Sequence, residues 1–125
     1  MLCVLAAISL AAGLLCAAPA LAKEPKKAQA KGTYGAIALN RNSKAVGYAY
    51  DFKGARDAKR EALAQCGEKQ CEVVVSFRGG CAAVSGSGKR LATGTGVTRD
   101  EAETKAAGKC GKDCAVLAWA CSKDK

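Results

Sequence analysis

Apolar residues recur along this chain with two different periods. Small apolar side chains return every three or four residues in 54–67 and 98–111, which predicts two amphipathic helices. Around them lie short apolar runs rich in valine, alanine and aromatic residues, which are typical of buried strands. The predicted strands cover 34–39, 45–50, 71–77, 81–84, 90–95 and 114–119. This mixture predicts an α+β fold.

Both predicted helices carry terminal signals. Thr98 and Glu101 have the spacing of a capping box, in which a hydroxyl and a carboxylate satisfy amide groups at the helix start. Gly67 and Gly111 stand where a helix end favours a left-handed residue. The first helix instead begins after Gly54, which has no side chain and therefore predicts a weaker cap.

The two halves of the pattern are alike. Aligned without a gap, 54–67 matches 98–111, and Cys66 falls on Cys110. Each helix is preceded by two strands, split by the predicted turns 40–44 and 85–89, and is followed by one more strand. We therefore expect duplicated strand-strand-helix-strand units that form one pseudo-symmetric, disulfide-stapled domain, because neither unit covers both faces of its sheet alone.

The N-terminal region predicts export. Residues 1–22 carry no charged side chain and end in Ala20-Leu21-Ala22, the small-residue pattern of a signal peptidase site. The alternative, lipidation of Cys16, is disfavoured by Leu15, which stands where a small residue is expected. We expect a signal peptide (1–22), a flexible basic tail (23–32) and a single domain (33–123), without a transmembrane segment after the signal is removed.

Cysteine usage agrees with export. Removing 22 of the 125 residues leaves 103, a length at which a core of small side chains is marginal. Of the eight cysteines, six remain, and an even number in a small exported domain predicts a structural disulfide framework: Cys66, Cys71, Cys81, Cys110, Cys114 and Cys121. One pairing closes two local loops and joins Cys81 to Cys121. Its rival bridges the halves through Cys66 and Cys110.

Several ordered motifs resemble a known family. The segments 34–38 (YGAIA) and 47–52 (GYAYDF), the cysteines with their flanking apolar residues, and the closing Trp119-x-Cys121 are similar to the family named domain of unknown function 4189. The resemblance spans about residues 34 to 122. It implies a small exported module with duplicated halves and supplies no catalytic residue. Gly54 departs from the serine that family members typically have before the first helix.

Catalytic chemistry finds little support in these residues. The chain has no histidine, the commonest acid–base group near neutral pH. Most carboxylates fall in the first turns of the predicted helices, where they complement the helix dipole, and only Asp51 and Glu72 remain as candidates for a cleft. The run Gly86–Lys89 lacks the phosphate-loop spacing. Without Cys-x-x-Cys pairs we expect no metal, no cofactor, no redox centre and no enzymatic activity.

Charge is the remaining functional lead. The chain has 20 basic and 11 acidic side chains, a formal charge of +9, all of it beyond residue 22. Six basic residues near the helices form the candidate anion- or partner-binding set: Arg56, Lys59, Arg60, Lys105, Lys109 and Lys112. The alternative is a solvated face that serves only solubility. Nucleic acid is not expected, because the aromatic residues fall within strands as core or half-core positions.

These observations favour a small basic binding module of the periplasm or the extracellular space. Its expected partner is a protein or an anionic component of the cell envelope. One alternative is an inhibitor or immunity-type protein that blocks a partner enzyme, and a less favoured one is a hydrolase of unfamiliar type. A single stoichiometric partner, held in a salt-insensitive way, distinguishes the inhibitor from the electrostatic binder.

Overall fold

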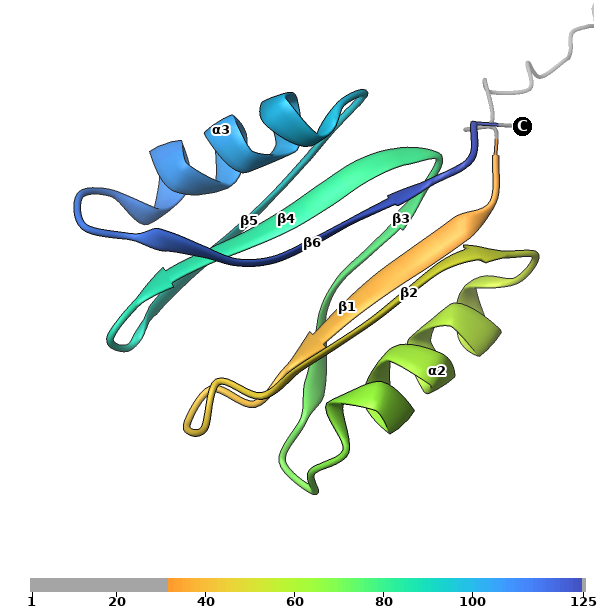
Figure 1. Cartoon of the computed structure of the whole chain (residues 1–125), viewed down its shortest axis with the longest axis horizontal. Coiled ribbons are helices and arrows are strands. Elements are labelled where there is room, and N and C mark those ends of the chain that lie inside the picture. Colours follow the sequence, from red (N-terminus) through yellow and green to blue (C-terminus); the bar gives the residue numbers. More distant parts are fainter. Residues whose placement is uncertain (1–31, 125) are drawn as a thin grey trace, which may run out of the picture.

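Eight helices and strands follow one another in the computed structural model, which describes residues 32–124 (Figure 1). They are β1 (Tyr34–Leu39), β2 (Val46–Phe52), α2 (Ala55–Cys66), β3 (Glu72–Arg78), β4 (Gly80–Ser87), β5 (Arg90–Gly96), α3 (Arg99–Cys110) and β6 (Ala115–Ser122). The predicted signal peptide (1–22) and the predicted tail up to residue 31 lie outside the described residues.

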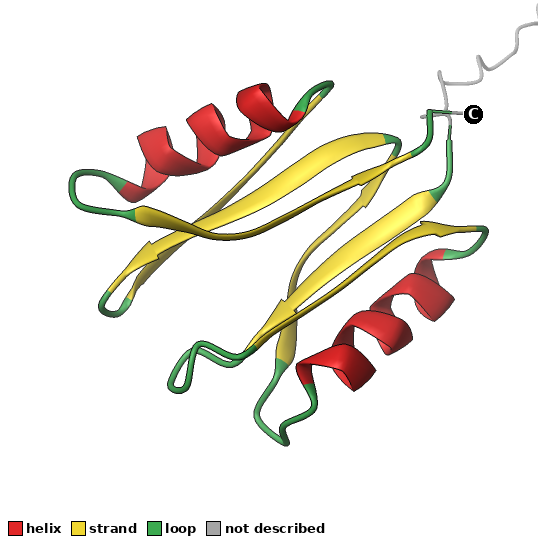
Figure 2. Ribbon diagram, in the orientation of Figure 1, coloured by secondary structure: helices red, strands yellow, loops and turns green. Residues whose placement is uncertain are grey.

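The strands form two antiparallel sheets of three strands each. Their orders are β2-β1-β3 and β5-β4-β6. The sheets stack face to face, α2 covers the outer face of the first sheet, and α3 covers the outer face of the second (Figure 2). The prediction of an α+β fold is confirmed, in a helix–sheet–sheet–helix arrangement that leaves β2 and β6 at edges of the two sheets.

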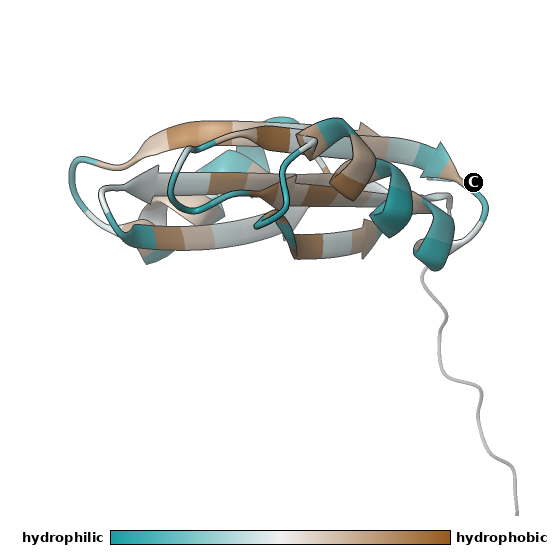
Figure 3. Cartoon of the chain, turned by 90° about the horizontal axis from the view of Figure 1, so that it is seen from below, coloured by the Kyte–Doolittle hydropathy of each residue, from teal (hydrophilic) through white to brown (hydrophobic). Residues whose placement is uncertain are grey.

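The central core lies between the sheets. Because side chains alternate between the faces of a strand, every second residue of β1 and β4 points into this layer. Its buried members are Ile37, Leu39, Phe77, Ala82, Val84, Ala118 and Ala120. Hydropathy follows the same division, since the strands carry most of the hydrophobic segments and the turns are hydrophilic (Figure 3).

Small residues let each helix lie close to its sheet. Ala58 and Ala62 of α2 are fully buried, and so are Ala102 and Ala106 of α3. Each sheet also has a glycine under its helix. A Cβ on Gly47 would overlap the backbone of Ala62 and Cys66, and one on Gly94 would lie 2.5 Å from the Ala102 oxygen. The two helix–sheet contacts are therefore partly backbone to backbone.

The two helix starts differ as their sequences suggest. The Thr98 hydroxyl accepts a hydrogen bond from the Glu101 N–H at 3.1 Å, whereas Gly54 provides no side-chain cap to α2. The Glu101 carboxylate accepts from the N–H of Val97, at 2.8 Å, and so reaches one residue beyond the capping threonine. That hydrogen bond, assisted by the nearby Lys105 ammonium, lowers the pKa of Glu101.

The second hairpin differs from its predicted form. Residues 85–89 were expected to form a turn, but β4 continues to Ser87 and the turn is formed by Gly88 and Lys89. Gly86 is a strand residue because it pairs with Leu91 of β5 and Ala115 of β6. It is also closely packed, since a Cβ there would lie 2.8 Å from Cδ1 of Leu117. Ser85 is buried and its hydroxyl has no hydrogen-bond partner among the described residues.

Three disulfides link the six described cysteines. Cys66 pairs with Cys71, Cys110 with Cys114, and Cys81 with Cys121. This is the arrangement with two local loops, and the bridge between the halves through Cys66 and Cys110 is absent from residues 32–124. The same residues contain no helix that is long and apolar enough to cross a membrane.

Candidate functional site

Basic side chains from two hairpin turns meet at one end of the molecule. Arg41 and Lys44 belong to the turn between β1 and β2, Lys89 belongs to the turn between β4 and β5, and Arg90 is the first residue of β5. The Lys44 ammonium donates hydrogen bonds to the Gly88 oxygen at 3.1 Å and to the Arg41 oxygen at 2.6 Å, so the two turns touch. The four cations line a pocket of about 200 Å³. We call them the hairpin-tip cluster.

The first turn is held by Asn40. This residue is buried, and its Oδ1 accepts hydrogen bonds from the N–H groups of Asn42 and Ser43, at 2.8 and 3.1 Å. Its own amide nitrogen donates to Glu68 at 2.8 Å. Such side-chain bonds to the following backbone define an Asx turn and fix the positions from which Arg41 and Lys44 project.

Arg90 is positioned by the end of α3. Its guanidinium donates to the Lys112 oxygen at 2.7 Å and to the Cys110 oxygen at 3.3 Å. Carbonyl groups at a helix end carry partial negative charge and attract a cation. Arg90 therefore serves the fold as well as the surface, and it is a poor choice for a test of binding.

The hairpin-tip cluster has a positive balance. Arg41 forms an ion pair with Glu72 at 2.6 Å, and both side chains are more than half exposed, so the pair contributes little to stability. The Lys44 contacts described above are to neutral carbonyl groups. Within residues 32–124, Lys89 has neither an ion pair nor a side-chain hydrogen bond. A second carboxylate, that of Glu68, lies at the same turn and accepts hydrogen bonds from the Asn40 amide and the Ser43 hydroxyl. Four cations thus face two carboxylates, and the surplus positive charge favours an anion.

The six basic residues selected from the sequence are divided by the fold. One group lies on α2 (Arg56, Lys59, Arg60) and the other on or just after α3 (Lys105, Lys109, Lys112). The two helices cover opposite outer faces of the molecule, so these residues do not make one patch (Figure 1). Arg60 and Lys105 are also paired with carboxylates of their own helices, at 3.0 and 3.5 Å.

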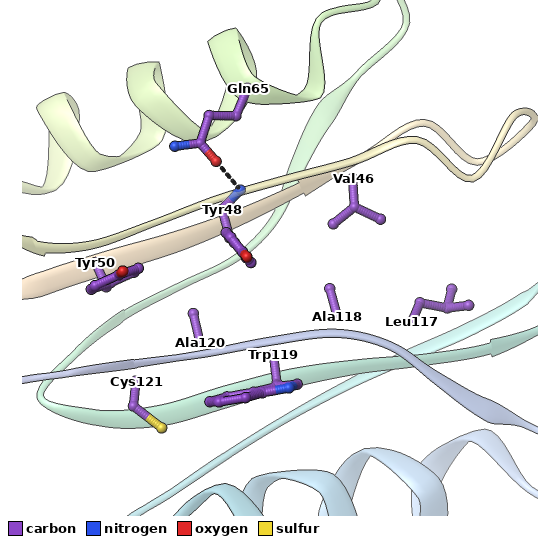
Figure 4. Close-up of a pocket in the computed structure, with 9 residues that line it drawn as sticks. All are labelled: Val46, Tyr48, Tyr50, Gln65, Leu117, Ala118, Trp119, Ala120 and Cys121. Carbon is purple, nitrogen blue, oxygen red and sulfur yellow. Dashed lines mark hydrogen bonds between the residues drawn. The ribbon is translucent and has the colours of Figure 1, made fainter.

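A second feature is a groove between the edge strands β2 and β6. It has a volume of about 710 Å³ (Figure 4). Tyr48 and Tyr50 of β2 project into it opposite the small side chains of Ala118 and Ala120. The complete lining is Val46, Tyr48, Tyr50, Gln65, Leu117, Ala118, Trp119, Ala120 and Cys121. We call this the β2–β6 groove.

The aromatic residues of this groove correct a sequence-based expectation. They were expected in core or half-core positions, but Tyr48 and Tyr50 are 43% and 53% exposed. Their rings meet edge to face with centroids 6.5 Å apart. The reason is positional: β2 is at the edge of its sheet, so side chains on its inner face extend past the core into the opening between the sheets.

The two carboxylates considered for a cleft have structural contacts instead. The Asp51 carboxylate accepts hydrogen bonds from the Lys123 N–H at 2.8 Å and from the Thr33 hydroxyl at 3.2 Å. Its N–H donates to the Ser122 hydroxyl at 2.8 Å, and its φ of 65° marks a bulge in β2. Asp51 joins the ends of the two sheets, while Glu72 is the partner of Arg41.

These observations define the class of protein: an α+β domain of two stacked antiparallel sheets with two outer helices and three disulfides. The chain belongs to the family described as Domain of unknown function (DUF4189), which it matches over residues 34–121. The resemblance seen in its motifs is thereby confirmed.

Two similar relatives are mycobacterial. The chain is 38% identical over 89 residues to the uncharacterized protein Rv1813c of Mycobacterium tuberculosis (strain ATCC 25618 / H37Rv), and equally to the uncharacterized protein Mb1843c of Mycobacterium bovis. These matches cover 71% of this chain and 60% of each relative, so the chain spans about 60% of their length.

A solved structure is also similar. The NMR structure of Rv1813c from Mycobacterium tuberculosis has a TM-score of 0.57 and 35% sequence identity to this chain. The match covers 78% of this chain and 79% of the other. A similar fold thus occurs in a relative that is itself described as uncharacterized.

Proposed function

We propose that this chain is an exported binding module that contacts an anionic partner through the hairpin-tip cluster. The observation that carries the proposal is the contact between the two hairpins, which collects four cations against the two carboxylates of Glu68 and Glu72. Long-range attraction to such a surface raises the rate of encounter with an anion. Outside the cytoplasm, anionic lipid headgroups, acidic polysaccharides and acidic proteins are the candidate partners.

Charge reversal tests this proposal. Lys89→Glu is expected to weaken binding about tenfold, because it replaces an attractive charge by a repulsive one within the cluster. A tenfold change in affinity corresponds to about 1.4 kcal/mol. The matched control is Lys59→Glu on the exposed face of α2, which changes the net charge equally at a distant place. Affinity is measured at moderate salt for a labelled glutamate nonapeptide and for phosphatidylglycerol vesicles.

The comparison of the two variants distinguishes a localised binding site from attraction by the net charge of the whole protein. A strong effect of Lys89→Glu with little effect of Lys59→Glu supports the hairpin-tip cluster. Equal losses for the two variants contradict it, because binding would then follow the net charge alone. No binding to either probe at moderate salt would remove the proposal altogether.

Export is the second part of the proposal. It is supported by the sequence of residues 1–22 and by the three disulfides, which persist in oxidising compartments. We expect a chain produced with its own N-terminus in a bacterium with a periplasm to be recovered outside the cytoplasm. Its mature form should begin at Lys23 and weigh six hydrogen masses less than the reduced chain. An uncleaved chain, whose eight cysteines are all free thiols, would refute export.

We also propose that the two halves are copies of one unit. The sheets have corresponding strand orders, and both helices have twelve residues and end in a cysteine bonded to a residue just before the next strand. The third disulfide distinguishes the halves. Cys81 and Cys121 are registered partners, and the corresponding registered pair in the first half is Ala36 and Ser76.

A further inference from the structure

We propose that the β2–β6 groove takes up an extended segment of a partner polypeptide. The segment is apolar where it lies along the groove and acidic where it reaches the hairpin-tip cluster. This inference rests on the proposed function for the charged end of the site. It adds the class of partner, a protein, and the way in which the partner is held.

The edge of β2 supplies backbone groups for such a segment. The N–H of Tyr48 donates to Oε1 of Gln65, at 3.4 Å, and therefore points away from β1. Since every second residue of an antiparallel strand presents its N–H and C=O to the same side, Val46 faces this edge as well. An added strand could pair with these groups, as in other cases of recognition by β-augmentation, after displacing the long side-chain contact of Gln65.

The groove also supplies side-chain contacts. Tyr48 and Tyr50 alternate with Ala49, which is buried against α2, so both rings lie on the groove side of β2 (Figure 4). Large, half-exposed tyrosines with few rotatable bonds are typical of recognition surfaces. The alanines opposite them, Ala118 and Ala120, leave room for apolar side chains of an added strand.

The groove leads into the hairpin-tip cluster, and this continuity specifies an acidic partner. Val46 lies at the groove end, two residues after Lys44. Leu117, which also lines the groove, lies against Gly86, while Leu91 lines the hairpin-tip pocket. A segment that follows the groove past Val46 therefore brings its next residues to Lys44 and Lys89. Acidic residues there complement the charge of the cluster.

Two other occupants fit less well. A lipid chain would fill the apolar groove but would form no hydrogen bond with the backbone groups at the β2 edge, where a peptide strand can pair. A second copy of this chain, paired antiparallel through β2, would bring Lys44 of one copy near Lys53 of the other. With a formal charge of +9 on each chain, that pairing is repulsive.

Two labelled peptides test the inference on the oxidised protein. The first alternates valine and threonine over six residues and ends in three glutamates, and the second is a glutamate nonapeptide. We expect the first to bind at least tenfold more tightly than the second. A version of the first peptide with N-methylated alternate amides should lose this advantage, because it cannot pair as a strand.

Variants locate the binding. Tyr48→Ala combined with Tyr50→Ala should weaken the valine–threonine peptide at least tenfold and leave the nonapeptide within about twofold. Both residues are exposed, so folding is retained, and Val97→Thr, at a 74% exposed site away from the groove, is the matched control. Hydrogen exchange provides a second readout: the amides of Val46 and Tyr48 should become protected when the first peptide binds.

The outcomes separate this inference from the proposed function. If Lys89→Glu weakens both peptides but the tyrosine variant weakens neither, the groove is not the site, while the anion-binding proposal stands. If the valine–threonine peptide has no advantage, or its binding leaves the amides of β2 exchanging as before, the inference is refuted. Tyrosine-dependent binding of phosphatidylglycerol vesicles without peptide binding would refute it in favour of a lipid.

Discussion

Replacing Cys81 by alanine together with Cys121 by serine is expected to lower the free energy of unfolding by about 4 kcal/mol. The disulfide joins β4 to β6 across a separation of 40 residues, so it closes a loop that contains β5 and α3. The entropy that a cross-link removes from the unfolded chain grows with loop length. The chosen pair also reproduces Ala36 and Ser76 of the first half, which makes it compatible with a registered strand pair.

The matched control is removal of Cys66–Cys71, which spans only five positions. The same relation gives about 2 kcal/mol for a loop of this size. Urea unfolding of the oxidised variants measures both losses in unfolding free energy. The comparison requires that the free energy of unfolding depends on urea concentration with the same slope in each variant. Equal losses, or a larger loss for the short loop, would contradict the loop-length argument.

Gly47→Ala is expected to destabilise the fold by about 3 kcal/mol or more. The added methyl group would overlap the backbone of α2 at Ala62 and Cys66, and backbone atoms cannot move aside as a flexible side chain can. Gly94→Ala is expected to act in the same way against Ala102 and Ala106 of α3. To remove the overlap, each helix would have to move away from its sheet. That movement would weaken the packing of the buried alanines between helix and sheet.

Gly108→Ala is the control for these glycines. Gly108 is exposed within α3, and nothing lies within 4 Å of the Cβ that would be added. Because alanine is the better helix former, this substitution should stabilise the protein by about 1 kcal/mol. Thermal unfolding of the three variants compares them directly, and a neutral Gly47→Ala would show that α2 is free to sit further from its sheet.

The elements could be predicted because their signals are local. Cys66 and Cys110 end the helices where the glycines that follow them predicted. Gly67 has the expected left-handed conformation, but Gly111 does not, with φ of 100° and ψ of −166°. The strand periods gave bounds within a few residues. The second hairpin could not be predicted, since Gly86 and Ser85 have the composition of a turn. Their place in β4 follows from pairing with β5 on one side and β6 on the other, which depends on residues far away in the sequence.

The candidate site was missed for a related reason. Lys44 and Lys89 lie far apart in the sequence, and only the stacking of the two sheets brings their turns into contact. The sequence did contain one signal, because both predicted turns carry cations. For Tyr48, alternation with Ala49 predicted a strand correctly. The alternation does not indicate whether the strand lies at the centre or at the edge of its sheet. The Tyr48 ring is exposed because β2 is an edge strand.

The disulfides have a consequence for assembly. Among the described cysteines, each bridge lies wholly before Gly79 or wholly after Gly80. Gly79 links β3 to β4 and Gly80 begins β4, and both have positive φ, of 68° and 71°. The halves are therefore joined covalently by the backbone alone. Two chains can exchange halves at this linker without reduction of any disulfide. Domain-swapped dimers are therefore topologically accessible to the fully oxidised protein at high concentration.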